Sequence, residues 1–177
     1  MDVNSLHAPF LSGLNIPWRI LLPTATKIMS PAHGSVENMA PCVDFFYLAR
    51  GRVFVTQSDV TGRERVMFCL GPDTLFNEAP AVAGFDALNS PFICDQKCIY
   101  YRFSHTLLHD PGFISNHPDL ISNLMTGLGI KVLIHHTSLS NFNNNVPAIT
   151  RLSRFLASIE FISKSNLRTS LNMQVGS

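Results

Sequence analysis

FFYLARGRVFV, residues 45–55, is the stretch that indicates a β fold. β-Branched and aromatic residues fill both of its halves, and such residues are enriched in strands. Arg50 and Gly51 separate the halves, and glycine supplies the positive φ that a tight turn between strands needs. The stretch therefore predicts two strands joined by a hairpin at Gly51.

The same pattern of short strands and turns extends over residues 18–103. Further strands are expected at 63–70, 92–94 and 98–103, the last two as a pair, with turns at 58–62 and 71–73. Many short strands at this spacing indicate an antiparallel barrel rather than a parallel sheet. The predicted fold class is mainly β plus α: an antiparallel double-stranded β-helix (jelly roll) followed by a long helix.

Helical spacing replaces the β pattern from Ser104 on. One or two helical turns are predicted over 104–108, ended by 110–112, and a long helix begins at Pro118, whose missing N–H costs little in a first turn. A 4-3-4-3 stripe follows this helix, and its members are Ile121, Met125, Leu128, Val132, His135, Leu139 and Phe142. Such a stripe is typical of the seam between two helices, so it predicts a homodimer.

A helix that packs its stripe on its own barrel is the alternative interpretation. Leu120, Leu124 and the pair Leu133-Ile134 form a second apolar set that could contact the barrel instead, leaving the heptad stripe for a partner. Beyond the helix, the asparagine-rich residues 143–147 predict a hinge, because asparagine competes with helical hydrogen bonding. Residues 148–159 again show helical spacing.

Composition limits the function classes. A net charge of +1 with 14% charged residues gives no field that would draw the whole chain onto nucleic acid. No apolar run approaches the ~20 residues that span a bilayer, and no signal peptide is visible, so we expect a cytoplasmic protein without a membrane partner. The four cysteines are expected to be reduced core thiols; the spacing of Cys94 and Cys98 would place both on one face of a strand.

The order of these features resembles the Crp/Fnr family of bacterial transcription regulators. The resemblance rests on FFYLARGRVFV (45–55), GRERVMFCLGPDTLFNE (62–78) and RLSRFL (151–156), and it covers roughly residues 18–160. It implies a non-enzymatic, effector-sensing domain that resembles cyclic-nucleotide-binding domains, dimerises through its long helix and repositions a DNA-binding domain. The domains expected are an arm (1–17), a sensing barrel (18–112), a dimerisation helix (113–142), the hinge (143–147) and the start of a truncated DNA-binding domain (148–177). DNA would be bound only through the missing part of that domain, because no recognition helix follows.

The resemblance also locates a candidate nucleotide cassette at residues 70–80. A phosphate cassette needs a glycine for close backbone approach, a glutamate for the ribose and an arginine for the phosphate. Glu78 takes the glutamate position and Asn77 the glycine position, where asparagine can still adopt the left-handed conformation. No arginine occurs where one is expected, in 84–90, so the sequence disfavours cyclic AMP, because a buried phosphate without a cation is badly solvated.

An apolar effector pocket is the remaining expectation. The candidate effector-binding residues are Phe76, Asn77, Glu78, Val82, Phe85, Leu88, Asn89, Ser90, Leu128 and His135. The family includes members that sense small aromatic molecules or bind haem, so the effector and any cofactor stay open, haem included. His135 could be a haem ligand or a hydrated histidine within the seam, and Glu78 could bond only to neighbouring amides.

A metal enzyme of the cupin type and a barrel that only scaffolds protein contacts are the rival interpretations. Cupins place two or three histidines inside the barrel, and residues 34–104 contain none. The sequence therefore predicts no catalytic residues and no metal site. A cyclic-nucleotide-binding domain with a degenerate cassette is the other alternative for the function.

Overall fold

The computed structural model describes residues 8–34, 36, 43–58, 64–84 and 92–142. The chain divides into two units, residues 1–130 and 131–177, at a boundary within the long helix. The predicted hinge, the helix after it and part of the candidate pocket (Phe85, Leu88, Asn89 and Ser90) lie outside the described residues.

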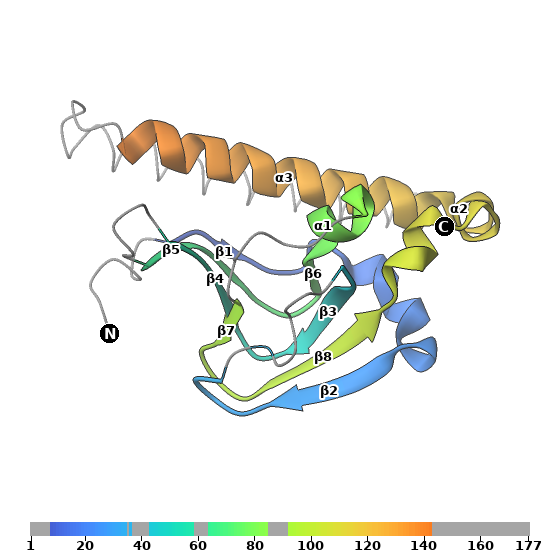
Figure 1. Cartoon of the computed structure of the whole chain (residues 1–177), viewed down its shortest axis with the longest axis horizontal. Coiled ribbons are helices and arrows are strands. Elements are labelled where there is room, and N and C mark those ends of the chain that lie inside the picture. Colours follow the sequence, from blue (N-terminus) through green and yellow to red (C-terminus); the bar gives the residue numbers. More distant parts are fainter. Residues whose placement is uncertain (1–7, 35, 37–42, 59–63, 85–91, 143–177) are drawn as a thin grey trace, which may run out of the picture. The chain divides into compact units, whose positions relative to one another are not determined.

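Two four-stranded sheets build the first unit (Figure 1). One sheet has the order β1 (Phe10–Leu11), β5 (Glu64–Leu70), β4 (Val53–Ser58) and β7 (Phe92–Cys94). The other has the order β2 (Thr26–Ser30), β8 (Cys98–Phe103), β3 (Phe45–Arg50) and β6 (Thr74–Phe76). All pairings among these strands are antiparallel except that of β1 with β5. The predicted class, antiparallel sheets followed by a long helix, is confirmed.

The helical elements lie between and after the strands. They are the 3-10 helices η2 (Ile16–Thr24) and η3 (His105–His109) and the α-helices α1 (Glu78–Ala83), α2 (Pro111–Asn116) and α3 (Pro118–Phe142). The long helix begins at Pro118 as predicted. None of the helices among the described residues has the length and apolar character needed to cross a membrane.

The turn at Gly51 does not join a hairpin, and this corrects the sequence prediction. Gly51 has the expected positive φ of 103°. However, β3 pairs with β6 and β8, whereas β4 pairs with β5 and β7, so the chain passes from one sheet to the other at this glycine. The predicted strand pair at 92–94 and 98–103 is divided in the same way, because β7 and β8 belong to different sheets.

Two helical segments were also missed. Residues 16–24 form η2 where a β region was predicted, with Pro17 in its first turn. Residues 110–112 end η3 as predicted, with Asp110 as its C-cap, but they also begin α2, which was not predicted. The Asp110 carboxylate accepts the Gly112 N–H at 2.9 Å, and Pro111 occupies the first helical position. An aspartate followed by proline is a helix start, because the pair caps one N–H and removes another.

A buried aromatic cluster joins the N-terminal segment, the second sheet and the helices. Trp18 is fully buried and packs edge-on against Phe45, with ring centroids 5.5 Å apart. Phe45 stacks on Phe103 at 5.2 Å. Leu120 and Leu124 from α3 belong to the same cluster, so the first half of α3 is part of the core of the first unit.

Asn15 fixes this half of α3 to the barrel. The buried Asn15 side chain donates to Asn123 Oδ1 at 2.9 Å and accepts the backbone N–H of Leu75. Asn123 in turn donates to the Leu14 carbonyl at 3.0 Å. Gly127 lies close by, where a Cβ would come within 3.0 Å of the Asn15 amide nitrogen. One side-chain pair therefore connects η2, β6 and α3.

Asn123→Ala should destabilise the protein by about 1–3 kcal/mol, because it leaves the buried Asn15 amide and the Leu14 carbonyl without partners. Urea unfolding at neutral pH measures the change. Ser122→Ala is the matched control: it is exposed on the same helix and gains similar helix propensity. Equal effects of the two substitutions would show that the asparagine pair does not hold the helix.

Candidate functional site

Asn77 shapes the loop between β6 and α1. Its backbone has φ 60° and ψ 18°, the left-handed conformation expected for a residue in the glycine position. The side chain is buried and donates from Nδ2 to the Asp44 carbonyl at 2.7 Å. Asparagine tolerates this conformation better than most side chains. The loop thus keeps the backbone turn of a cassette while its side chain is committed to the barrel.

Phe76 belongs to the core of the barrel. Its ring contacts Phe46 at 5.1 Å, Phe92 at 5.2 Å and Tyr100 at 5.9 Å, and its side chain is 1% exposed. These partners come from both sheets. A displacement of Phe76 therefore requires both sheets to adjust.

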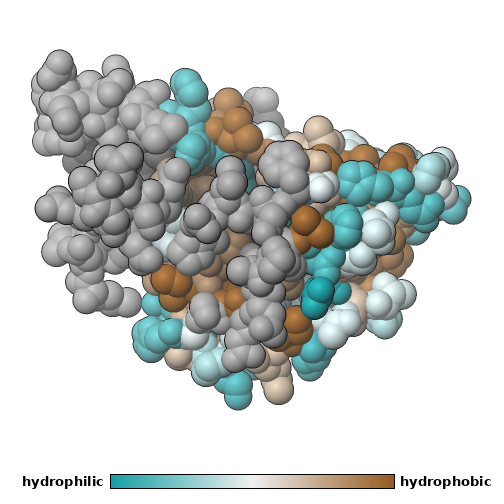
Figure 2. Space-filling model, in the orientation of Figure 1, coloured by the Kyte–Doolittle hydropathy of each residue, from teal (hydrophilic) through white to brown (hydrophobic). Residues whose placement is uncertain are grey.

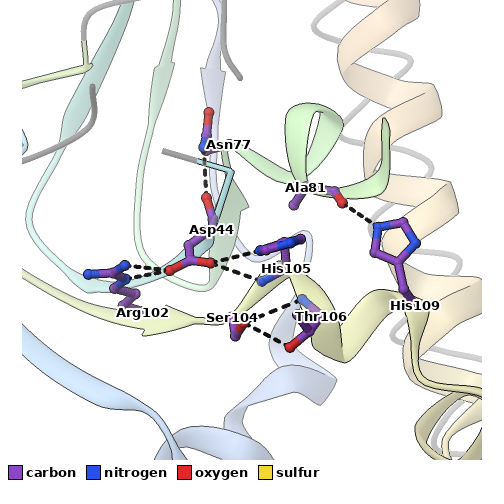
Figure 3. Close-up of polar contacts among 8 residues, drawn as sticks. All are labelled: Asp44, Asn77, Ala81, Arg102, Ser104, His105, Thr106 and His109. Atoms are coloured by element: carbon purple, nitrogen blue, oxygen red, sulfur yellow. Dashed lines mark hydrogen bonds and ion pairs between the residues drawn. The ribbon is translucent and has the colours of Figure 1, made fainter. Parts of the chain in front are cut away.

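The Asp44 carboxylate gathers the polar groups near this loop (Figure 3). Oδ2 accepts Arg102 Nε at 2.6 Å, and Oδ1 accepts the His105 backbone N–H at 3.0 Å. His105 Nδ1 lies 3.2 Å from Oδ1, and it is the donor because a carboxylate only accepts. Burial on its own would raise the pKa of Asp44, but the hydrogen bonds from His105 and Arg102 outweigh burial and lower it.

Both ends of α1 are attached to the rest of the barrel. At its start, Asn77 bonds to Asp44, which also holds His105 of η3. Further along, the Ala81 carbonyl accepts His109 Nε2, also of η3, at 2.9 Å (Figure 3). The Ser104 hydroxyl caps the start of η3 by accepting the Thr106 N–H. The cassette helix and the segment that leads to α2 and α3 are therefore linked through two histidines.

The structure brings only part of the candidate pocket together. Phe76, Asn77 and Glu78 are adjacent and buried, with Glu78 in the first turn of α1, whereas Val82 is exposed. Leu128 is partly buried against the aromatic cluster of the first unit. His135 is half-buried in the second unit.

Sequence reasoning missed the polar hub of this region, which is Asp44, Arg102, His105 and His109. None of these four residues was among the candidates predicted from the sequence. Their partners are 28 to 61 residues away along the chain. Only the acid directly before the apolar strand β3 could have signalled the hub. Among the described residues, no three histidine, cysteine or acidic side chains cluster as metal ligands.

One side of α3 is covered and another is exposed. Leu120, Leu124 and Gly127 are buried, and Ile121 and Leu128 of the predicted seam are partly buried on the same core. Met125 is 57% exposed. Apolar atoms interrupt the polar surface along α3 in Figure 2.

In the second unit, Val132 is 64% exposed, whereas Ile134 is buried. Leu133, its neighbour in the second apolar set, is 63% exposed, because consecutive helical residues point about 100° apart. His135 is half-buried, and the side chains of Leu139 and Phe142 lie outside the described part of the chain.

Comparison with known proteins places this geometry in a known fold. No family model and no curated protein sequence matches the chain. Among solved structures, the c-di-GMP-responsive global regulator CLP of Xanthomonas campestris is 15% identical with a TM-score of 0.63, covering 72% of this chain and 64% of its own. Oxidised CprK in complex with o-chlorophenolacetic acid is 14% identical with a TM-score of 0.62, covering 80% and 58%. The catabolite activator protein of Thermus thermophilus is 16% identical with a TM-score of 0.57, covering 69% and 56%.

The chain has the cyclic-nucleotide-binding-like fold of Crp/Fnr regulators. This confirms the fold that the resemblance implied. The chain spans less than two thirds of the length of these three structures. Two of them are described as a global regulator of gene expression and a catabolite activator protein.

Asn77→Ala should destabilise the protein more than Asn77→Gly, by about 1 kcal/mol. Both substitutions remove the hydrogen bond to Asp44, but only alanine strains the left-handed backbone. Urea unfolding of the two variants gives the difference directly. Equal stabilities would mean that the positive φ at position 77 is not a constraint.

Lowering the pH should reduce the free energy of unfolding, in part through Asp44. Because its pKa is lower in the folded chain than the ~3.9 of an unfolded aspartate, its stabilisation is complete above that value and is lost as pH falls through the folded pKa. Asp44→Asn should therefore lose less stability than wild type between about pH 6 and about pH 3. Asp119→Asn, an exposed change of the same charge in α3, is the control and should keep the wild-type slope. An unchanged slope for Asp44→Asn would contradict the assignment.

Proposed function

We propose that this chain is the effector-sensing and dimerisation region of a Crp/Fnr-like transcription regulator. The fold supports this proposal, as does the cassette loop attached through η3 to the start of α2. In this proposal a bound effector changes the packing of α3 with a second copy. The change passes through residues 143–147 to a DNA-binding domain.

The effector is a small apolar or aromatic molecule rather than a cyclic nucleotide. The observation that carries this proposal is the lack of basic residues in the sequence around the cassette. Residues 66–96 contain no lysine, arginine or histidine, while four acids, Asp73, Glu78, Asp86 and Asp95, lie in the same stretch. Arg102, the arginine of the polar hub, is already paired with Asp44.

An anionic ligand would have to be desolvated at this position. Glu78 is buried beside Asn77, and the Asn77 amide donates to the Asp44 backbone carbonyl. A phosphate that replaced water here would need a cation to offset its desolvation, and drawing Arg102 away would leave Asp44 partly buried without its partner. A neutral ligand avoids both costs.

The exposed apolar residues of α3 support dimerisation. Met125 and Val132 are seven residues apart, so they lie on one side of the helix. Gly129 lies between them and has no atoms near the position of its missing Cβ, which would allow close approach of another helix. We assign the seam to Ile121, Met125, Leu128, Val132, His135, Leu139 and Phe142, with Ile121 and Leu128 shared between the partner and the barrel core.

Cyclic AMP should bind no more tightly than adenosine, which lacks the phosphate. Isothermal titration of the purified full chain with each compound tests the ligand class, and mass spectrometry of the denatured protein identifies any co-purified apolar molecule. Micromolar binding of cyclic AMP with much weaker binding of adenosine would contradict the proposal and favour a degenerate but working cassette.

Val132→Asp should convert the dimer to a monomer, because two carboxylates would be brought together at the seam. Light scattering after size-exclusion chromatography gives the mass in solution. Thr126→Asp adds the same charge to an exposed position of the same helix outside the seam and should remain dimeric. A fully dimeric Val132→Asp would remove Val132 from the interface.

A further inference from the structure

β2 is an outer strand of the second sheet. Its five residues, Thr26–Ser30, pair antiparallel with β8 on one side, from Thr26 opposite Arg102 to Ser30 opposite Cys98. In the order β2-β8-β3-β6, no described strand lies on its other side, and Figure 1 shows β2 at the border of the sheet. A strand in this position directs alternate backbone N–H and C=O groups away from the sheet, where a further strand can bind them.

The other outer strands are shorter, and one of them is covered. β1 has two residues, and β6 and β7 have three each. The free side of β7 is occupied by the segment before residue 36: the Cys94 carbonyl accepts the His33 N–H at 2.7 Å, and the Gly34 carbonyl accepts the Cys94 N–H at 2.8 Å. Within the described ranges, no segment forms backbone bonds of this kind with β2. β2 is therefore the longest outer strand, and its free edge is uncovered by the described residues.

The side chains of β2 divide between the two faces of the sheet, because successive residues of a strand point to opposite sides. Lys27 and Met29 share the outer face, and both are exposed, Met29 by 64%. Ile28 is half-buried on the inner face, where Ser30 is buried and its hydroxyl lies 3.0 Å from the Tyr100 hydroxyl. A strand added beside β2 would therefore meet a cation and an apolar side chain on one face and a second apolar side chain on the other.

Positive charge is in excess at this edge. β2, β8 and β3 contain Lys27, Arg102 and Arg50 but no acidic residue. Arg102 is paired with Asp44, whereas Lys27 forms no ion pair with another described residue. A lysine on an outer strand opposes pairing with a basic strand, but opposite charges that face each other across two strands attract. Lys27 thus favours an acidic partner strand.

We propose that β2 binds an extended acidic segment of another protein, which becomes a fifth strand of the second sheet. The backbone groups of the free edge bond to the segment, as in other cases of strand addition. The segment runs antiparallel to β2, the more stable of the two pairings, with an acidic residue opposite Lys27 and apolar residues opposite Ile28 and Met29. This inference goes beyond the proposed function, because it concerns neither the cassette nor the seam of α3, and its failure would leave that proposal unchanged.

The blocked peptide Thr-Val-Val-Glu-Thr tests this site on the full chain, with Thr-Val-Val-Lys-Thr as the matched control. Antiparallel pairing places the fourth residue of either peptide opposite Lys27. Titrations followed by nuclear magnetic resonance of the isotope-labelled protein should show about five-fold tighter binding of the glutamate peptide. Lys27→Glu should reverse this preference. Because Lys27 is exposed, this variant should fold as wild type does, and circular dichroism checks that it does.

Amide hydrogen exchange distinguishes an added strand from docking by side chains alone. The bound glutamate peptide should slow exchange at alternate amides of β2, and a version with methylated backbone nitrogens should not bind. Absence of binding by both unmethylated peptides, equal binding of the two by wild type, or binding without slower exchange in β2 would each overturn the proposal. Slow exchange in the free protein that increases with protein concentration would also overturn it, because a second copy of the chain would then occupy the edge.

Discussion

Burial of one side of α3 on its own barrel is the constraint on which the rest of the structure depends. Leu120 and Leu124 complete the aromatic core, and the Asn15–Asn123 pair fixes the helix to β6. Once that side is committed, the angular position of every other residue in residues 118–130 follows from the helical repeat. Met125 must then face outward, so the same packing defines the exposed surface that we propose a second copy contacts.

The cassette region shows how a fold can be retained while the chemistry of its binding loop changes. The left-handed turn persists at Asn77, and α1 still follows it. The polar groups nearby serve the protein itself: Asp44 binds Arg102 and His105, and Ala81 binds His109. A loop whose donors and acceptors are used internally selects a ligand by shape and apolar contact more than by charge. We propose that the hydrogen bond between α1 and η3 transmits the effect of such a ligand to the helices.

Local sequence patterns predicted the positions of the strands and helices better than they predicted which strands pair. Most strands and the start of α3 were predicted, because period-two and heptad spacing are properties of short segments. The Gly51 turn was located, but the sheets on its two sides were not, since a positive φ fits a hairpin and a crossover equally well. The end of η3 at Asp110 was predicted but the start of α2 was not, because a proline that ends one helix can begin the next. The hydrogen bonds of Asp44 could not be predicted from local patterns, because they join residues about sixty positions apart.

We propose that the side of α3 left exposed by its own barrel is the surface on which two copies meet. The most direct measurement is intermolecular cross-linking of Met125→Cys, with Thr126→Cys, also exposed, as the matched control. Symmetry-related residues at a helix seam are close enough for a disulfide, whereas neighbours turned away by about 100° are not. We predict a covalent dimer for Met125→Cys under mild oxidation and none for Thr126→Cys. Monomers in both cases, or equal cross-linking at both positions, would contradict the account.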